Sequence, residues 1–303
     1  MPIRTLFLFL NLLLISPFIS AQQIALTFDD APRGDGQLYT GLKRSEILLE
    51  KLKQYNIPQV AFFCVPGNKD AVGMLRLKMY GQAGHIIANH SYTHPQIAEV
   101  GVDQFILDIR MADTALQKLP NFRPWFRFPY LNEGRDETTR DRIRQALQEM
   151  RYINGYVTVD NYDWYLESMF QQALKEHKKI NYDLLKDLYI EHIWNSIQFY
   201  QNIALKALNR SPKHVLLLHE NDLAALFLDD LISFLRGEGW EIISPEDAYK
   251  DPIASHIPDV TMNNQGRVAA IAREQGIQGR DLVQVSEDEA YLEQYFSRKK
   301  VFR

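Results

Sequence analysis

The stretch Asn89 to Pro95, N-H-S-Y-T-H-P, places two of the eight histidines of this 303-residue chain four residues apart. Side chains at positions i and i+4 lie on one face of a helical turn, where two ring nitrogens can converge on one ion. Spacing alone does not distinguish such a pair of metal ligands, His90 and His94, from two polar residues on a solvated helix face. A third ligand is needed to favour the metal interpretation.

Two adjacent carboxylates, Asp29 and Asp30, follow the apolar run Ile24 to Phe28. Carboxylates at the end of a buried strand repel one another unless a cation or a base lies between them. Asp before Ala-Pro also suits a turn. Together with the two histidines, Asp30 would complete a three-ligand zinc site with an open position for water, which is typical of catalytic zinc. Zinc in such a site lowers the pKa of bound water to about 7.

Three more apolar runs end in side chains that can do chemistry. Arg127 in R-F-P-Y can pair with a carboxylate, Asp163 lies beside aromatic residues in D-N-Y-D-W, and His219 closes H-V-L-L-L-H. In parallel α/β folds the chemistry gathers at the carboxyl ends of the strands. We therefore expect these side chains to share one hydrolytic site with the carboxylates and histidines.

An alternation of strands and helices must position these residues, and it predicts a parallel sheet or barrel. Strands are expected at residues 23–28, 59–65, 124–129, 154–160, 214–219 and 240–245, and helices at 45–55, 102–119, 138–150 and 227–236. Two parts of the chain depart from the repeat. Residues 165–208 contain about two long helices and no strand, which indicates an insertion in a barrel of residues 22–251. Residues 252–303 are expected to form a helical tail packed on the outside.

Residues 1–21 have the pattern of an export signal, with a positive start, an apolar run and a cleavage site after Ala21. The apolar run is shorter than the roughly 20 residues that span a bilayer, so an uncleaved anchor is the weaker alternative. We expect a secreted or periplasmic protein without stable membrane insertion after cleavage.

Charge and composition bear on which partners and which kinds of site the protein can have. A net charge of −4 gives no reason to expect a nucleic-acid partner. The basic segment at residues 297–303 is short, and a terminus exposed to solvent accounts for it. Cys64 is the only cysteine, which excludes an intramolecular disulfide and a cysteine-rich zinc site. The length suits one α/β barrel with appendages. The oligomeric state stays open.

Five segments together resemble a known family. T-F-D-D, H-S-Y-T-H, R-F-P-Y, D-N-Y-D-W and L-L-L-H are similar, in order and at predicted strand ends, to the five motifs of the NodB-homology polysaccharide deacetylases, a carbohydrate esterase family. The resemblance covers roughly residues 24–245. It implies a distorted TIM-like (β/α) barrel and metal-dependent removal of acetyl groups from an N-acetylated polysaccharide or oligosaccharide.

The resemblance also implies roles for individual residues. The metal, for which Zn²⁺ is the expected ion, would be held by Asp30, His90 and His94. Imidazole and carboxylate ligands would also accept cobalt, nickel or iron. Asp29 would be the general base that takes a proton from water. Arg127 would pair with it, and such a neighbour typically lowers an Asp pKa by about 1–3 units.

The leaving-group side of the implied site has its own residues. His219 would be the general acid that protonates the amine, with Asp163 holding and charging it. The backbone N–H of Tyr130 would help to stabilise the oxyanion, and Trp164 and Leu217 would wall the pocket for the acetyl methyl group. Amide hydrolysis needs a nucleophile, charge stabilisation and a proton donor, and each need would be met.

The chain departs from the family pattern at two positions. Ala31 stands where glycine is usual, so the turn after Asp30 is expected to avoid a positive φ, and Glu220 stands where aspartate often follows the acid histidine. Two alternatives to the N-deacetylase remain. One is an O-acetyl esterase or small N-acyl amide hydrolase on the same site, and the other is a non-catalytic glycan-binding barrel. The presence of both a base and an acid argues against a binding module.

Overall fold

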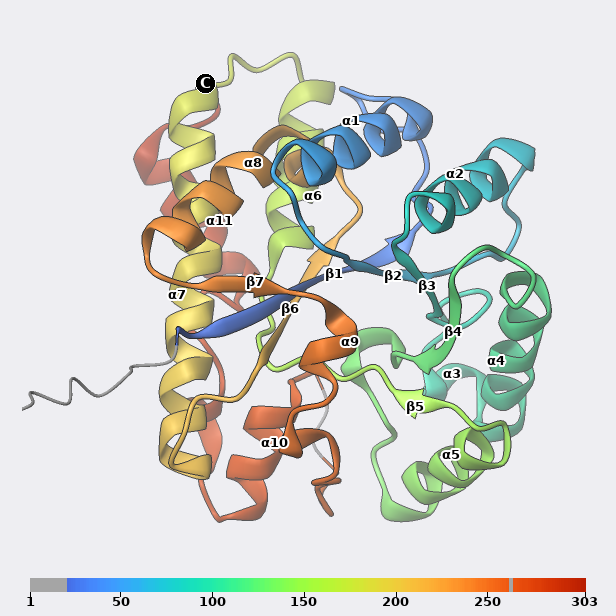
Figure 1. Ribbon diagram of the computed structural model, residues 1–303. Coiled ribbons are helices and arrows are strands. Elements are labelled where there is room, and N and C mark those ends of the chain that lie inside the picture. Colours follow the sequence, from blue (N-terminus) through green and yellow to red (C-terminus); the bar gives the residue numbers. More distant parts are fainter. Residues whose placement is uncertain (1–20, 262–263) are drawn as a thin grey trace, which may run out of the picture.

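The protein is built on a curled, incomplete barrel of parallel strands, seen in a computed structural model that describes residues 21–261 and 264–303 (Figure 1). The order across the sheet is β5-β4-β3-β2-β1-β6, and β7 also pairs with β1. All of these pairs are parallel. The strands are β1 (Gln23–Ala31), β2 (Ala61–Cys64), β3 (Ile86–Asn89), β4 (Phe122–Phe126), β5 (Ile153–Asn154), β6 (His214–His219) and β7 (Glu241–Ile243). The predicted α/β fold of TIM-like type is therefore confirmed.

The central strand β1 is almost wholly buried, as its continuous apolar sequence predicts for a parallel strand covered on both faces. It extends three residues beyond the predicted end, so Asp29 and Asp30 belong to the strand itself. In the register with β6, Asp29 is the direct partner of His219. On the other side of the sheet, β3 ends at Asn89, immediately before the first histidine.

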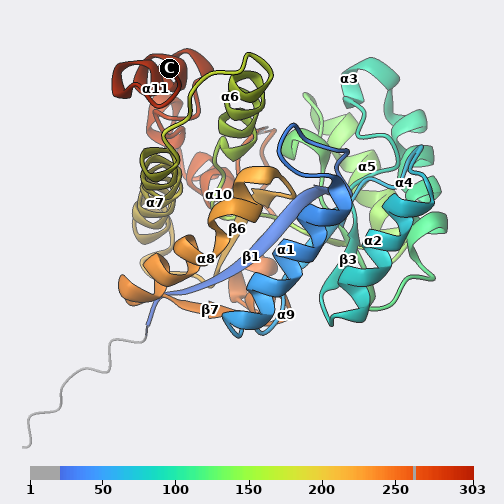
Figure 2. The same cartoon turned by 90° about the horizontal axis from the view of Figure 1, so that it is seen from above.

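Helices cover the outside of the sheet (Figures 1 and 2). Around β1, α8 packs beside α1, and α1 beside α2. Polar side chains at Thr40, Asp70, Asp136 and Asn221 cap the amino ends of α1, α2, α5 and α8. The helices of this outer layer are α1 (Gly41–Gln54), α2 (Ala71–Gln82), α3 (Ile97–Val100), α4 (Val102–Leu116), α5 (Glu137–Glu149), α8 (Asp222–Gly237) and α9 (Pro245–Ala248).

Helix α2 was not among the predicted elements. Its inward face includes two glycines, Gly73 and Gly81, together with Arg76. Glycine lowers helix propensity, and a buried arginine breaks the apolar periodicity that a sequence pattern detects. Gly81 is needed for close packing, because a Cβ there would lie 2.1 Å from the carbonyl oxygen of Pro120.

The predicted strand 154–160 is wrong for most of its length. Only Ile153–Asn154 pair with β4, and the chain then crosses toward β6, where Val159 forms a single parallel bridge with Leu216. This crossing segment fills the gap between β5 and β6, where the barrel is open. Asp163 consequently lies at the first residue of a helix rather than at a strand end.

Between residues 163 and 208 the chain forms α6 (Asp163–Lys175) and α7 (Tyr182–Leu208), with no strand of the sheet between them. Whether this segment is an insertion into the barrel stays a prediction. None of the helices in the described residues is both long and apolar enough to span a membrane. Residues 1–20 of the predicted signal peptide lie outside the described residues.

The C-terminal segment, which was expected to pack on the outside as a helical tail, contains α10 (Arg267–Glu274). Its residues Val268, Ala269, Ile271 and Ala272 are fully buried in the main hydrophobic core, and the helix packs against α7. The last helix of the described residues is α11 (Glu289–Lys299), which contacts α6.

Candidate active site

Three predicted ligands, Asp30, His90 and His94, come together at the carboxyl end of the sheet. One ligand atom from each lies within 4.8 Å of the others. Asp30 Oδ1 is 3.7 Å from His90 Nε2 and 3.5 Å from His94 Nε2. Tetrahedral zinc with bonds of about 2.0–2.1 Å places neighbouring ligand atoms about 3.3 Å apart. The three side chains therefore fit one small divalent ion with only slight adjustment.

The spacing of His90 and His94 is that of a helical turn, but in the structure the pair does not lie on one. Residues 90–96 form an irregular loop between β3 and α3. Ser91 Oγ accepts the backbone N–H of His94 at 3.0 Å, and Asp108 from α4 accepts the backbone N–H groups of Tyr92 and Thr93 at 2.6 and 2.9 Å. These bonds explain the hydroxyl residue at Ser91. They hold the loop so that two rings converge without a helix.

The site also concentrates unusual backbone conformations. Asp30, Ser91 and His94 have positive φ values of 65°, 67° and 57°, and Tyr130 and Leu131 have values of 57° and 49°. Non-glycine residues in this region are uncommon and gather at functional sites. The positive φ falls on Asp30 itself, while Ala31 continues the strand. The replacement of glycine by Ala31 is therefore tolerated, as expected.

The electrostatics of the three residues suit cation binding. Burial alone would raise the pKa of Asp30, but His219, His94, His90 and Arg33 hold it well below its usual range. Burial lowers the pKa of His90 and of His94 to about 4, so both rings are neutral at pH 7. His90 Nδ1 lies 2.8 Å from the Arg127 carbonyl oxygen, an acceptor that fixes the proton on Nδ1. Its Nε2 is then free to bind a metal.

Asp29 points at the same region and is paired with Arg127, as predicted. The Arg127 guanidinium donates to Asp29 Oδ1, and both side chains are buried. Arg127 also donates to the hydroxyl of Thr27 at 2.9 Å and to the carbonyl of Gly155 at 2.7 Å, and it lies 3.8 Å above the ring centroid of Phe63. An arginine held on so many sides fixes the carboxylate that it contacts.

Arg127 was expected to lower the pKa of Asp29, but in the structure this pKa is raised. Burial raises the pKa of this carboxyl above its ordinary value, and this effect outweighs the opposing effect of Arg127. The adjacent Asp30 raises it further. A raised pKa makes Asp29 a stronger proton acceptor, which suits a general base better than a strongly acidic carboxyl would. Its second oxygen, Oδ2, lies 3.7 Å from His90 Nε2, next to the candidate metal position.

His219 and Asp163 form the second predicted pair. The Asp163 carboxylate lies 2.6 Å from His219 Nδ1 and also accepts the backbone N–H of His219 at 2.9 Å. Burial lowers the pKa of His219, but Asp163 more than compensates and raises it to about 9. The imidazole is thus protonated at pH 7. Because Nδ1 faces Asp163, Nε2 is the nitrogen that can serve a substrate.

The position of Asp163 depends on its neighbour Asn161. The Asn161 side-chain amide donates to the Leu217 carbonyl at 2.6 Å, and its oxygen accepts the backbone N–H of Asp163 at 2.9 Å. The start of α6 is thereby attached to β6, which carries His219. A helix amino end also favours a carboxylate.

A cleft of about 390 Å³ adjoins these groups. Tyr130, Trp164 and Leu217, the predicted substrate contacts, all line it together with the metal-ligand residues, Asp29 and His219. Six further residues line the cleft. Five of them had no role predicted from the sequence, because they come from segments far apart in the chain: Arg33, Phe128, Leu131, Asp160 and Asn264. The sixth is Tyr162, one of the aromatic residues that could stack on a sugar ring.

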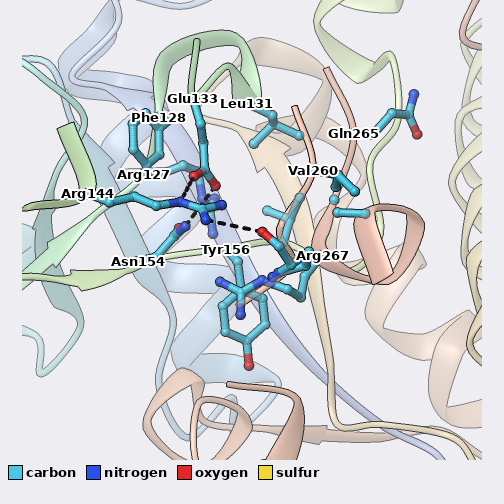
Figure 3. Close-up of a pocket in the computed structure, with 14 residues that line it drawn as sticks. Arg127, Phe128, Leu131, Glu133, Arg144, Asn154, Tyr156, Val260, Gln265 and Arg267 are labelled. Carbon is cyan, nitrogen blue, oxygen red and sulfur yellow. Dashed lines mark hydrogen bonds and ion pairs between the residues drawn. The ribbon is translucent and has the colours of Figure 1, made fainter. Parts of the chain in front are cut away.

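A smaller cavity of about 40 Å³ shares Phe128 and Leu131 with the cleft and is also lined by Arg127 (Figure 3). Arg144 crosses it and donates to Glu133 at 2.6 Å and to the Pro258 carbonyl at 3.1 Å. Arg267 stacks on the ring of Tyr156 with a separation of 4.4 Å. The charged side chains Arg144 and Arg267 therefore have partners within the protein at this cavity.

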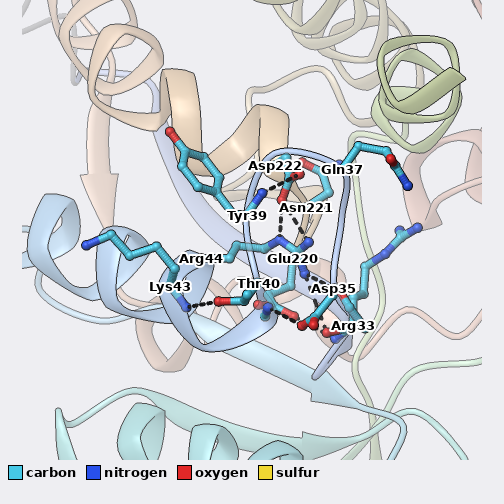
Figure 4. A network of polar contacts seen from close by, with 12 residues as sticks. Arg33, Asp35, Gln37, Tyr39, Thr40, Lys43, Arg44, Glu220, Asn221 and Asp222 are labelled. Atoms are coloured by element: carbon cyan, nitrogen blue, oxygen red, sulfur yellow. Dashed lines mark hydrogen bonds and ion pairs between the residues drawn. The ribbon is translucent and has the colours of Figure 1, made fainter. Parts of the chain in front are cut away.

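Glu220, the second departure from the family pattern, lies in a buried ionic network below the cleft. It pairs with Arg76 at 2.6 Å and accepts the Tyr80 hydroxyl at 2.9 Å. The neighbouring Asp222 pairs in the same way with Arg44 at 2.7 Å. Figure 4 shows Glu220, and Asp222 with its partner Arg44, close to the loop that follows β1. The longer side chain of Glu220 is thus used for structure rather than for proton transfer.

Comparison with known proteins agrees with this geometry. Residues 19–152 match the family model described as polysaccharide deacetylase. A peptidoglycan-N-acetylglucosamine deacetylase of Bacillus cereus is 31% identical over 143 residues, 47% of this chain and 46% of that protein. The chain therefore spans about half the length of this curated relative.

Solved structures share the fold. A peptidoglycan deacetylase of Bacillus subtilis is 20% identical, with a TM-score of 0.50, covering 76% of this chain and 93% of that chain. A mutant of a CE4 family pseudoenzyme, with restored enzymatic activity, is 21% identical, with a TM-score of 0.52, covering 76% of this chain and 68% of that chain. Residues 19–152 of the chain are thus similar to the polysaccharide deacetylase family, and the solved structures show that the fold is shared.

Proposed function

We propose that this protein is a metal-dependent hydrolase that removes acetyl groups from an N-acetylated glycan. One observation supports the proposal above all. A cation-binding trio, a carboxylate paired with arginine and a histidine paired with aspartate all face one cleft. A glycan-binding module needs only the cleft and has no use for a matched base and acid.

Asp30, His90 and His94 would hold the ion, and their ligand types suit zinc. The bound ion supplies Lewis acidity, which activates water and polarises the acetyl carbonyl. Asp29 takes the proton of the attacking water, while Arg127 keeps that carboxylate in place. The water oxygen forms a bond to the acetyl carbon.

The remaining steps are protonation of the leaving amine and stabilisation of the oxyanion, and other residues of the cleft carry them out. Breaking the C–N bond leaves a poor amine leaving group, to which His219 Nε2–H gives its proton. Asp163 stabilises the imidazolium before this transfer. The backbone N–H of Tyr130 stabilises negative charge on the carbonyl oxygen, and Trp164 and Leu217 enclose the methyl group. A histidine protonated at neutral pH favours an amide over an ester, because an alkoxide leaves more readily than an unprotonated amine.

The proposal includes export of the chain, which is supported by the sequence pattern of residues 1–21. The substrate would then be an acetylated glycan outside the cytoplasm. The Bacillus cereus relative is named for its action on peptidoglycan N-acetylglucosamine.

The test is acetate release from N-acetylglucosamine oligomers and, in parallel, from acetylated xylan, with and without a chelator. We expect release from the amide substrate that stops on chelation and returns with zinc. Faster release from xylan would move the assignment to an O-acetyl esterase. Activity that survives complete metal removal would exclude the mechanism.

A further inference from the structure

We propose that Arg33 recognises a carboxylate on the sugar next to the acetylated residue, so that the enzyme prefers an acidic glycan. This inference deepens the proposed function and rests on it. It is carried by the position of Arg33, by the rigidity of its loop and by the charges around it.

Arg33 lies where two hollows meet. It lines the catalytic cleft together with Trp164, and the same two residues line a second groove of about 550 Å³. The second groove runs between the loop after β1 and helix α6, where Gln171 and Lys175 are among its lining residues. A glycan whose acetylated sugar occupies the cleft would therefore pass over Arg33 and Trp164 into this groove.

The loop that carries Arg33 is anchored through its backbone (Figure 4). The N–H of Arg33 donates to Glu220 Oε2 at 2.7 Å, and its carbonyl accepts from Arg76 at 2.6 Å. Arg44 donates to the Gly34 carbonyl at 2.9 Å. A Cβ on Gly36 would lie 2.3 Å from an Asp222 oxygen. Because Glu220, Arg76, Arg44 and Asp222 are themselves buried and paired, the backbone of this loop is fixed.

The backbone of Arg33 is bound by these partners, whereas its side chain faces the cleft. Figure 4 shows it pointing away from the ionic network below it. The Arg33 side chain is 34% exposed, and its ion pair with Asp30 spans 3.6 Å, too long for a good hydrogen bond. Asp30 presents its other oxygen to both histidines, so a bound cation would weaken this contact further.

The charges in the second groove favour an anionic ligand. Arg44 and Glu167 are buried, and each has protein partners. Asp35 is exposed, but it accepts the backbone N–H of Gly41. Arg33 and Lys175 are the remaining cations there. A guanidinium binds carboxylates with two parallel hydrogen bonds, and Trp164 beside it offers a flat face for a sugar ring.

The test compares two tetrasaccharides that differ in one group. One alternates glucuronic acid with N-acetylglucosamine, and in the other the carboxylates are reduced to alcohols. Acetate release by the zinc-loaded full chain gives kcat/KM for each. We expect at least about a tenfold preference for the acidic form, as a charge-assisted pair provides. In Arg33→Gln the ratio should fall below about twofold, and Arg33→Lys should keep an intermediate ratio.

Control variants separate a direct role of the Arg33 side chain from a general loss of charge or of loop structure. Arg110→Gln, which removes an exposed arginine of helix α4, should retain the tenfold ratio. Zinc content and melting temperature of Arg33→Gln should match the wild type, which shows that the anchored loop is intact. A sulfated tetrasaccharide turned over faster than the carboxylated one would overturn the assignment of a carboxylate.

Failure of this inference can be told apart from failure of the proposed function. Equal kcat/KM for the two tetrasaccharides overturns the role of Arg33 and leaves deacetylation standing. If neither is deacetylated, calorimetric binding of the same pair decides the inference, and the proposed function fails only if N-acetylglucosamine oligomers release no acetate either. Tighter binding of the acidic form that is lost in Arg33→Gln supports it, and equal binding overturns it.

Discussion

Asp29 and His219 are direct partners in the parallel pairing of β1 with β6. The proposed base and the proposed acid are therefore placed side by side by strand register, which is a rigid feature of the sheet. Each also has its own charged neighbour, Arg127 for Asp29 and Asp163 for His219. Two titratable groups with opposed surroundings are what separate base and acid catalysis requires.

Replacing the base should separate metal binding from turnover. In Asp29→Asn the three metal ligands are unchanged, so zinc should bind in the same amount as in the wild type. The amide cannot accept the proton of water, and kcat should fall by about 10²–10⁴. Zinc content and acetate release are measured on the same sample. Asp103→Asn, at an exposed position in α4, is the matched control, and full activity of Asp29→Asn would remove it as the base.

Replacing the partner of the acid should move the pH profile. Burial lowers the pKa of His219, and Asp163 raises it to about 9. Activity that needs the protonated imidazole is lost as pH rises through this pKa. In Asp163→Asn the pKa falls, so the alkaline limb of kcat/KM should shift to lower pH. A bound cation lowers the pKa of His219 in both proteins, so the difference between them is the quantity to measure. An unchanged alkaline limb would show that Asp163 does not charge His219.

The buried carboxyl of Glu287, which is not a catalytic residue, should make the stability of the protein depend on pH. Burial raises its pKa from 4.5 to about 7, although it accepts hydrogen bonds from Tyr200 and Gln265 at 2.6 and 2.8 Å. Because the pKa of Glu287 is higher in the folded than in the unfolded state, its protonated form stabilises the fold. This contribution to the free energy of unfolding is complete below pH 4.5 and is lost as the pH rises through about 7. Glu287→Gln should therefore reduce the decline in melting temperature between about pH 4.5 and 8. The exposed Glu289→Gln should not, and equal curves for wild type and Glu287→Gln would contradict the assignment.

The core position of α10 can be tested with two isoleucines of the C-terminal segment. Ile271 is fully buried, whereas Ile257 is 62% exposed. Ile271→Ala should lower the free energy of unfolding by about 2–5 kcal/mol, because it removes packed methyl groups and leaves a cavity. Ile257→Ala should change it by less than about 0.5 kcal/mol. Denaturant titration measures both, and similar values would mean that α10 is not part of the core.

Much of the site could be predicted from the sequence because its residues follow apolar runs. Parallel strands end at one edge of a sheet, so Asp30 and His219 could be expected to meet there, whereas β3, the short strand before His90, was not predicted. The five motifs then supplied roles. The backbone around the histidines could not be predicted in this way, since an i, i+4 spacing is compatible with a helix and with the loop that Ser91 holds.

Other features depend on contacts between distant segments, which no local pattern reveals. Arg33 faces the cleft because Glu220, 187 residues away, binds its backbone N–H. Asn264 reaches the same cleft from the C-terminal segment. Helix α2 was overlooked for another reason, because glycine and arginine interrupt the apolar stripe that Leu77 and Tyr80 form on its buried face.

The central claim is that one cation held by Asp30, His90 and His94 is required for deacetylation. The most direct test is to titrate metal-free protein with zinc and to follow acetate release from an N-acetylglucosamine oligomer. Release should be absent without zinc, rise linearly and saturate at one equivalent per chain, and His94→Ala should need a far higher zinc concentration. Acetate release by the metal-free protein, or a His94→Ala titration identical to that of the wild type, would contradict the claim.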